Sequence, residues 1–153
     1  MGGKKPKSRK PSATRSKWQP DKITYFVDAS LGSKLLPEAL RNEGADVAIH
    51  NDHFSQGTPD EEWLHVVGER NWVVLTKDNR IRYRKLERDA LMRAGVRCFV
   101  LTAKGLRGQE IAALFIKALP AIQRFLDKHS DSFIAKITRS SAVHLIVPEK
   151  ETK

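Results

Sequence analysis

Short apolar runs alternate with helical segments from residue 23 onward, and this alternation constrains the fold more than any other feature of the chain. The runs cover residues 23–27, 46–50, 72–76 and 97–101. Helical apolar spacing follows the first two runs, and a basic helical stretch follows the third, at about 82–94. This order predicts a mostly parallel, doubly wound sheet with right-handed crossovers. The common strand order for such sheets is 2-1-3-4, with a ligand crevice where strands 1 and 3 are neighbours.

Helix and turn signals complete a predicted α/β domain over residues 21–150. Thr58 is expected to cap a helix whose first position is Pro59, after a loop at 51–57. Residues 111–126 have the best amphipathic spacing in the chain, and Pro120 predicts a kink or break there. Residues 133–138 and 143–147 are predicted to form a C-terminal β-hairpin around 139–142.

Acidic residues stand where the predicted strands end. Asp28 follows the first run and Asp78 follows the third, while Asp60 and Glu61 open a helix after the second. Carboxylates that converge on one sheet edge repel each other unless a cation lies between them, and Mg²⁺ prefers oxygen ligands of this kind. We therefore expect Asp28, Asp60 and Asp78 to bind a divalent metal. Glu61 fits a helix-capping role equally well, and an aspartate at a strand end is often only a turn former.

The rest of the chain is strongly basic. Its net charge is +10, with a pI of about 9.9, which favours nucleic acid as a partner and an anionic membrane surface second. Residues 1–20 contain seven basic residues and no acid, a composition typical of a disordered tail. This tail is either an arm for nucleic acid or a solubilising segment. An acidic pocket in a basic protein suggests a metal-dependent enzyme that acts on a polyanion.

Several side chains around the predicted crevice are candidates for substrate binding. A charge run after Asp78 is equally typical of a solvated helix face, whereas a position beside an acidic pocket suits phosphate contacts. Tyr83 and Trp18 could stack on a base. The substrate-binding candidates are Ser30, Lys77, Arg80, Arg82, Arg84 and Lys104.

Other motifs give weaker signals. His50, Asp52 and His53 could bind zinc, although a plain polar loop fits them better. Cys98 is the single cysteine and is expected to be a buried small hydrophobe. The chain has no P-loop and no Gly-x-Ser-x-Gly elbow. It also has no apolar stretch near the roughly 20 residues of a membrane span and no secretory signal, so a cytoplasmic location is expected.

Three segments resemble the PIN-domain nucleases, and in particular the short PIN-like proteins grouped with VapC-type toxins. They cover residues 26–30, 58–62 and 74–79, within a resemblance that extends over about 23–126. Many family members carry a second acid shortly after the one matched by Asp78, where this chain has Asn79 and Arg80. The helix-borne glutamate of the family has no unambiguous match, so Asp60 or Glu61 stands in for it.

The resemblance implies a PIN-like three-layer sandwich and metal-dependent cleavage of RNA. In that case Asp28, Asp60 and Asp78 hold Mg²⁺ or Mn²⁺, and Glu61 takes part in catalysis. It also implies a cognate antitoxin that presents an arginine or lysine to the acidic pocket, and a homodimer is a further expectation. The departure at Arg80 leaves open a non-catalytic RNA-binding module on the same scaffold. A receiver-like phospho-acceptor domain lacks its acidic pair, because Ala29 and Ser30 follow Asp28.

Overall fold

The computed structural model describes residues 23–148. The basic tail predicted for residues 1–20, with Trp18, lies outside these described residues. None of the described helices is long and apolar enough to cross a membrane.

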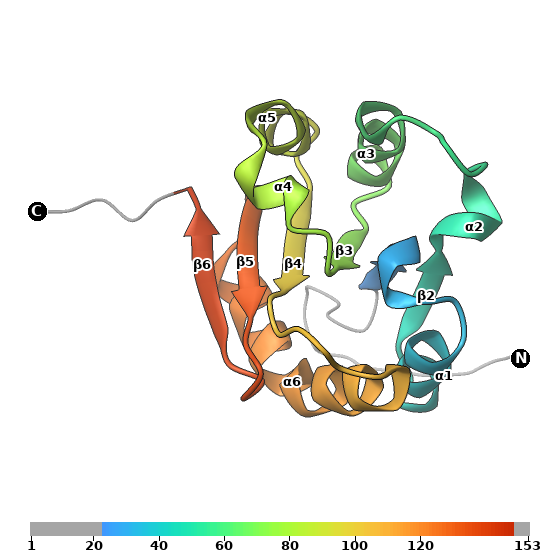
Figure 1. Cartoon of the computed structure of the whole chain (residues 1–153). Coiled ribbons are helices and arrows are strands. Elements are labelled where there is room, and N and C mark those ends of the chain that lie inside the picture. Colours follow the sequence, from blue (N-terminus) through green and yellow to red (C-terminus); the bar gives the residue numbers. More distant parts are fainter. Residues whose placement is uncertain (1–22, 149–153) are drawn as a thin grey trace, which may run out of the picture.

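A six-stranded sheet forms the centre of the described domain (Figure 1). Its strands are β1 (Thr24–Val27), β2 (Asp46–Ile49), β3 (Val73–Thr76), β4 (Arg97–Leu101), β5 (Phe133–Ile137) and β6 (Val143–Val147). They lie in the order β2-β1-β3-β4-β5-β6. All neighbours are parallel except β5 and β6, which form an antiparallel pair. The predicted 2-1-3-4 order and the C-terminal hairpin are both confirmed.

Helices connect the strands and cover both faces of the sheet. They are the short 3-10 helix η3 (Ala29–Leu31), α1 (Leu35–Asn42), α2 (His50–His53), α3 (Asp60–Glu69), α4 (Arg80–Tyr83), α5 (Lys85–Arg93) and α6 (Gly108–Lys128). Figure 1 shows α1 and α6 on one face, and α3 with α5 on the other. The three-layer α/β sandwich predicted from the sequence is confirmed.

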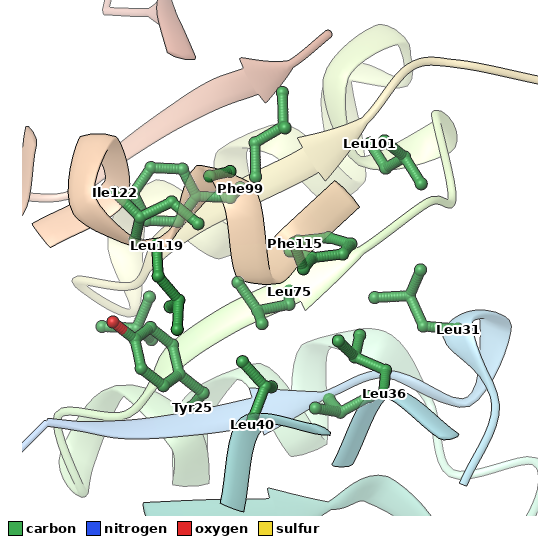
Figure 2. Packing of buried hydrophobic residues seen from close by; sticks show 14 of the residues in the cluster. Tyr25, Leu31, Leu36, Leu40, Leu75, Phe99, Leu101, Phe115, Leu119 and Ile122 are labelled. Carbon is green, nitrogen blue, oxygen red and sulfur yellow. The ribbon is translucent and has the colours of Figure 1, made fainter. Parts of the chain in front are cut away.

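Alternate residues of the strands divide the core into two layers. Tyr25, Leu75 and Phe99 belong to the layer under α1 and α6, which Figure 2 shows from close by. Phe26 and Val74 belong to the opposite layer, under α3 and α5. Side chains of a strand point to opposite faces in turn, so every strand of the sheet centre is apolar on both sides. Full burial of a side chain of this size stabilises the fold by about 1.5–3 kcal/mol.

The segment between β2 and α3 differs from its prediction. The second strand ends at Ile49, one residue earlier than predicted, and residues 50–53 form the short helix α2 where a loop was predicted from residue 51. The His50 ring packs into the aromatic core beside Phe26 and Trp63, which stabilises this helix. Thr58 does not cap α3. Its hydroxyl donates to the Ser55 carbonyl oxygen at 2.7 Å and closes a turn, while Pro59 takes the cap position.

Two other helix predictions also need correction. The basic stretch predicted at 82–94 is two helices, α4 and α5, with extended backbone at Arg84 between them. Of the kink or break predicted at Pro120, the break is absent, because α6 is helical from Gly108 to Lys128. Ala118 and Ile122 on either side of the proline are fully buried, so packing against the sheet offsets the hydrogen bond that a proline cannot make.

Candidate active site

A cavity of about 560 Å³ opens at the carboxyl ends of β1 and β3. These strands are neighbours, with Val27 opposite Leu75, so Asp28 and Asp78 leave the sheet on the same edge. Asp60, at the start of α3, lines the same cavity. The three aspartates that the sequence placed at strand and helix ends therefore all line one cavity.

Asp28 is fixed by hydroxyl groups from both strand ends. Its Oδ2 accepts hydrogen bonds from Ser30 Oγ at 2.6 Å, from Ser30 N at 3.2 Å and from Thr76 Oγ1 at 2.9 Å. Thr76 Oγ1 in turn accepts from the Asp78 amide at 3.0 Å, and Ser30 Oγ accepts from the Lys77 amide at 3.2 Å. This network holds Asp28 and the backbone of Asp78 in one fixed arrangement.

Asp78 carries an internal cation. Arg80 Nε lies 3.0 Å from both carboxylate oxygens, and Arg80 Nη2 lies 2.5 Å from Oδ2. The Arg80 amide also donates to Oδ1 at 3.0 Å. These hydrogen bonds hold the pKa of Asp78 below its usual range, although partial burial opposes the shift. The same pairing raises the pKa of the Arg80 guanidinium.

Asp60 and Glu61 point in different directions. Asp60 Oδ1 accepts a hydrogen bond from Trp63 Nε1 at 3.0 Å, and Trp63 stacks on Phe26 with ring centroids 5.4 Å apart. Glu61 is exposed outside the cavity, and its Oε2 lies 4.0 Å from Arg93 Nη2. The catalytic role predicted for Glu61 has no support from its position.

Comparison with known proteins identifies the family of this chain. The sequence model of the family described as "PIN like domain" matches residues 23–103. The chain belongs to the PIN-like domain family. A protein of Mycobacterium tuberculosis (strain ATCC 25618 / H37Rv), named "Putative ribonuclease VapC45", is 31% identical over 103 residues. The match covers 65% of this chain and 75% of that relative. No solved structure matches the chain significantly.

The basic residues of this PIN-like domain that were predicted to bind substrate lie in three different places. Arg80 lines the acidic cavity. Lys77 and Lys104 instead line a second cavity of about 250 Å³ beside it, at the ends of β3 and β4. Arg82 and Arg84 line neither cavity. The structure therefore separates the predicted substrate-binding residues, and only Ser30 and Arg80 accompany the three aspartates.

The donor set of the PIN-like cavity fits a hard divalent cation. Carboxylate oxygens are the ligands that Mg²⁺ and Mn²⁺ prefer. All hydrogen bonds that Asp28 accepts from other described residues go to Oδ2, which leaves Oδ1 for a cation. Among residues 23–148 no three His, Cys, Asp or Glu side chains are already gathered as a metal cluster. A cation at Asp78 would have to share that carboxylate with Arg80 or displace it.

The zinc alternative at His50, Asp52 and His53 is not supported within the described residues. His50 is 8% exposed and packs against Phe54 and Trp63, with ring centroids 5.5 and 5.6 Å away. Cys98 is fully buried, as predicted.

Thr76 is the site residue that sequence reasoning missed. It is 3% exposed and links Asp28 to Asp78. A threonine as the last residue of an otherwise apolar strand was the available signal.

Proposed function

We propose that this protein is a divalent-metal-dependent endoribonuclease of the PIN-like type. The observation that carries the proposal is the convergence of Asp28, Asp60 and Asp78 on one open cavity. Membership of the PIN-like family and the ribonuclease name of the mycobacterial relative support it.

The residues of the cavity would have different roles in phosphodiester hydrolysis. Asp28, Asp60 and Asp78 would hold Mg²⁺ or Mn²⁺, which supplies an activated water and positive charge beside the phosphate. Ser30 and Thr76 keep Asp28 oriented through their hydroxyl groups. Arg80 offers a planar pair of donors that suits a phosphate. If its guanidinium moved from Asp78 to an RNA phosphate, it would bind the substrate and at the same time free the Asp78 carboxylate for the metal.

The test is cleavage of end-labelled RNA by purified protein with Mg²⁺ or Mn²⁺. Asp28→Asn and Asp78→Asn should each lower the rate about 100-fold or more, the size of effect expected when one preorganised charged group is removed. Asp46→Asn is the matched control, because Asp46 is exposed at the other end of β2 and should leave the rate unchanged. Equal cleavage in EDTA, or by Asp78→Asn, would show that the mechanism is wrong.

We also propose that the chain is the cytoplasmic toxin of a toxin–antitoxin pair. The resemblance to VapC-type proteins supports this role, and the acidic cavity can be neutralised by an inserted arginine or lysine of the antitoxin. Expression of the protein alone should arrest growth and degrade RNA, and co-expression of the neighbouring gene should restore both. Normal growth with soluble protein and intact RNA would contradict the toxin role.

We also propose that two copies of this chain form a homodimer. Tyr83 and Leu86 are large apolar residues on α4 and α5 that are 69% and 83% exposed. Light scattering measures the molar mass in solution and should give a dimer for the wild type and a monomer for Leu86→Glu. A monomeric wild type at micromolar concentration would remove the dimer.

The alternative function is a non-catalytic RNA-binding module, favoured by the pairing of Arg80 with Asp78. Its signature is salt-sensitive RNA binding without cleavage in any divalent metal. The cleavage assay above separates the two functions.

A further inference from the structure

The acidic cavity has a second wall of different chemistry. This amide wall consists of Asn51, Phe54, Ser55 and Gln56, which lie between β2 and α3 in the chain and line the same cavity as the aspartates. It presents no carboxylate, lysine or arginine to the cavity. Asp52 is the only such residue between positions 50 and 59, and it does not line the cavity. This wall therefore offers no positive charge to a phosphate.

The framework of the amide wall is held in place. The Phe54 ring packs edge-on against Phe26 and at a tilt against His50, with ring centroids 5.9 and 5.5 Å away. The turn after Phe54 is closed by Thr58, whose amide and hydroxyl both donate to the Ser55 carbonyl oxygen, at 3.1 and 2.7 Å. A ligand would therefore meet a preformed surface.

The polar groups of the wall are available to a ligand. Asn51 and Gln56 are exposed, and within residues 23–148 their side-chain amides make no hydrogen bond. Each amide offers a donor and an acceptor without charge. Phe54, which lies between Asn51 and Gln56 in the sequence, is partly exposed and also lines the cavity. The wall therefore combines an aromatic surface with two neutral hydrogen-bonding groups.

This combination suits a nucleobase. Proteins recognise single-stranded RNA by stacking bases on aromatic side chains and by bonding base edges. A volume of about 560 Å³ lies in the range that holds a small-molecule ligand. Asp60, whose carboxylate accepts from Trp63, lines the same cavity as the amide wall, so a base on this wall and a phosphate at the aspartates would share one cavity.

We infer that the amide wall binds one base of single-stranded RNA beside the cleaved phosphate and so sets the sequence preference of the enzyme. Asn51 and Gln56 would bond the base edge, and Phe54 would contact its face. The inference rests on the proposed ribonuclease function and adds a specificity site to it.

The first experiment maps cut sites in an RNA pool with randomised positions. The wild type should prefer one base, by about tenfold or more, at one position next to the cut. Asn51→Ala and Gln56→Ala should flatten that preference while RNA is still cleaved. Gln123→Ala is the matched control, because Gln123 is exposed on α6 away from the cavity and should keep the preference. Cleavage without base preference by the wild type, or an unchanged preference in both variants, would overturn the inference.

The second experiment needs no cleavage. Side-chain amide signals of Asn51 and Gln56, assigned in NMR spectra with the alanine variants, are followed in EDTA while each of four nucleoside 3′-monophosphates is added. They should move with at least one nucleotide and stay unmoved with ribose 5-phosphate, which lacks a base. Unmoved signals with all four nucleotides, or equal shifts with ribose 5-phosphate, would overturn the inference. Signal shifts in a protein that does not cleave RNA under any condition would support the base-binding site and contradict the proposed ribonuclease function.

Discussion

At the proposed metal site, the Arg80 guanidinium would compete with a cation for the Asp78 carboxylate. Arg80 places a positive charge on one of the three carboxylates, and a like charge repels a divalent cation. We predict that Arg80→Gln binds Mn²⁺ roughly tenfold more tightly, an effect of about 1.4 kcal/mol, as measured by calorimetry. Lys117→Gln is the control, because Lys117 is exposed on α6 and does not line the acidic cavity. Equal affinities in the wild type and Arg80→Gln would contradict the competition.

Sequence reasoning found the aspartates but could not resolve their neighbours. Strand ends follow from the apolar runs, so the placement of Asp28 and Asp78 was predictable. Successive residues of a helix lie about 100° apart around its axis, so Asp60 and Glu61 point in different directions, and the sequence favoured Asp60 as the metal ligand. The contact of Arg80 with Asp78 depends on the conformation of an exposed side chain, which no pattern specifies.

Tyr25 provides a prediction on pH dependence. Burial raises its pKa from 10.0 to about 12, although Arg97 acts in the opposite direction. The unfolded chain ionises Tyr25 first as pH rises, so its contribution to stability is complete below pH 10 and is lost between pH 10 and about 12. Over this window the wild type should lose on the order of 2–3 kcal/mol more than Tyr25→Phe, measured by urea unfolding.

The exposed tyrosine is the matched control for this measurement. Tyr83 is 69% exposed, so Tyr83→Phe should follow the wild-type pH profile. The Tyr25 hydroxyl has no hydrogen-bond partner among the described residues, so Tyr25→Phe should also be at least as stable as the wild type at pH 7. Parallel profiles for the wild type and Tyr25→Phe above pH 10 would contradict the buried, neutral phenol.

At the scale of elements, the contact between α3 and the end of α5 depends on one glycine. A Cβ at Gly68 would lie 2.0 Å from the Ala94 carbonyl oxygen, which is backbone and cannot turn aside. Alanine normally stabilises a helix by about 0.5–1 kcal/mol relative to glycine. Here we predict that Gly68→Ala destabilises the protein by about 1–3 kcal/mol, as measured by urea unfolding.

Gly108, at the start of α6, is the matched control for Gly68. A Cβ there would meet Leu35 Cδ1 at 2.9 Å, the end of a flexible side chain that is 48% exposed. Gly108→Ala should therefore change the free energy of unfolding by less than about 0.5 kcal/mol. Equal effects of the two substitutions would contradict the close helix contact.

The elements that sequence reasoning misplaced are those decided by tertiary contacts. The strand β4 follows its apolar run residue by residue. The helix α2 forms where the sequence suggests a loop, because the His50 and Phe54 rings find partners on Phe26 and Trp63. Local signals cannot report such partners, since they come from distant parts of the chain.

At the scale of the whole molecule, charge is distributed unevenly along the chain. Residues 1–20 carry seven positive charges and no negative one, so residues 21–153 carry only +3, from 21 basic and 18 acidic residues. The domain also places three aspartates in its main cavity. In the proposed ribonuclease, long-range attraction of RNA should therefore depend strongly on the basic segment, while the cavity would select the phosphate that is cut.

The salt dependence of RNA binding tests this division. Each phosphate contact to single-stranded RNA adds about −0.7 to the slope of log K against log salt. Replacing the seven basic residues of segment 1–20 by glutamine in the full chain should reduce the slope by about 2 or more, measured by fluorescence anisotropy in 50–300 mM KCl. Replacing Lys117, Arg124 and Lys128, which are exposed on α6, should change it by less than about 1. An unchanged slope after the glutamine replacements would assign the segment a solubilising role and leave RNA capture to the domain.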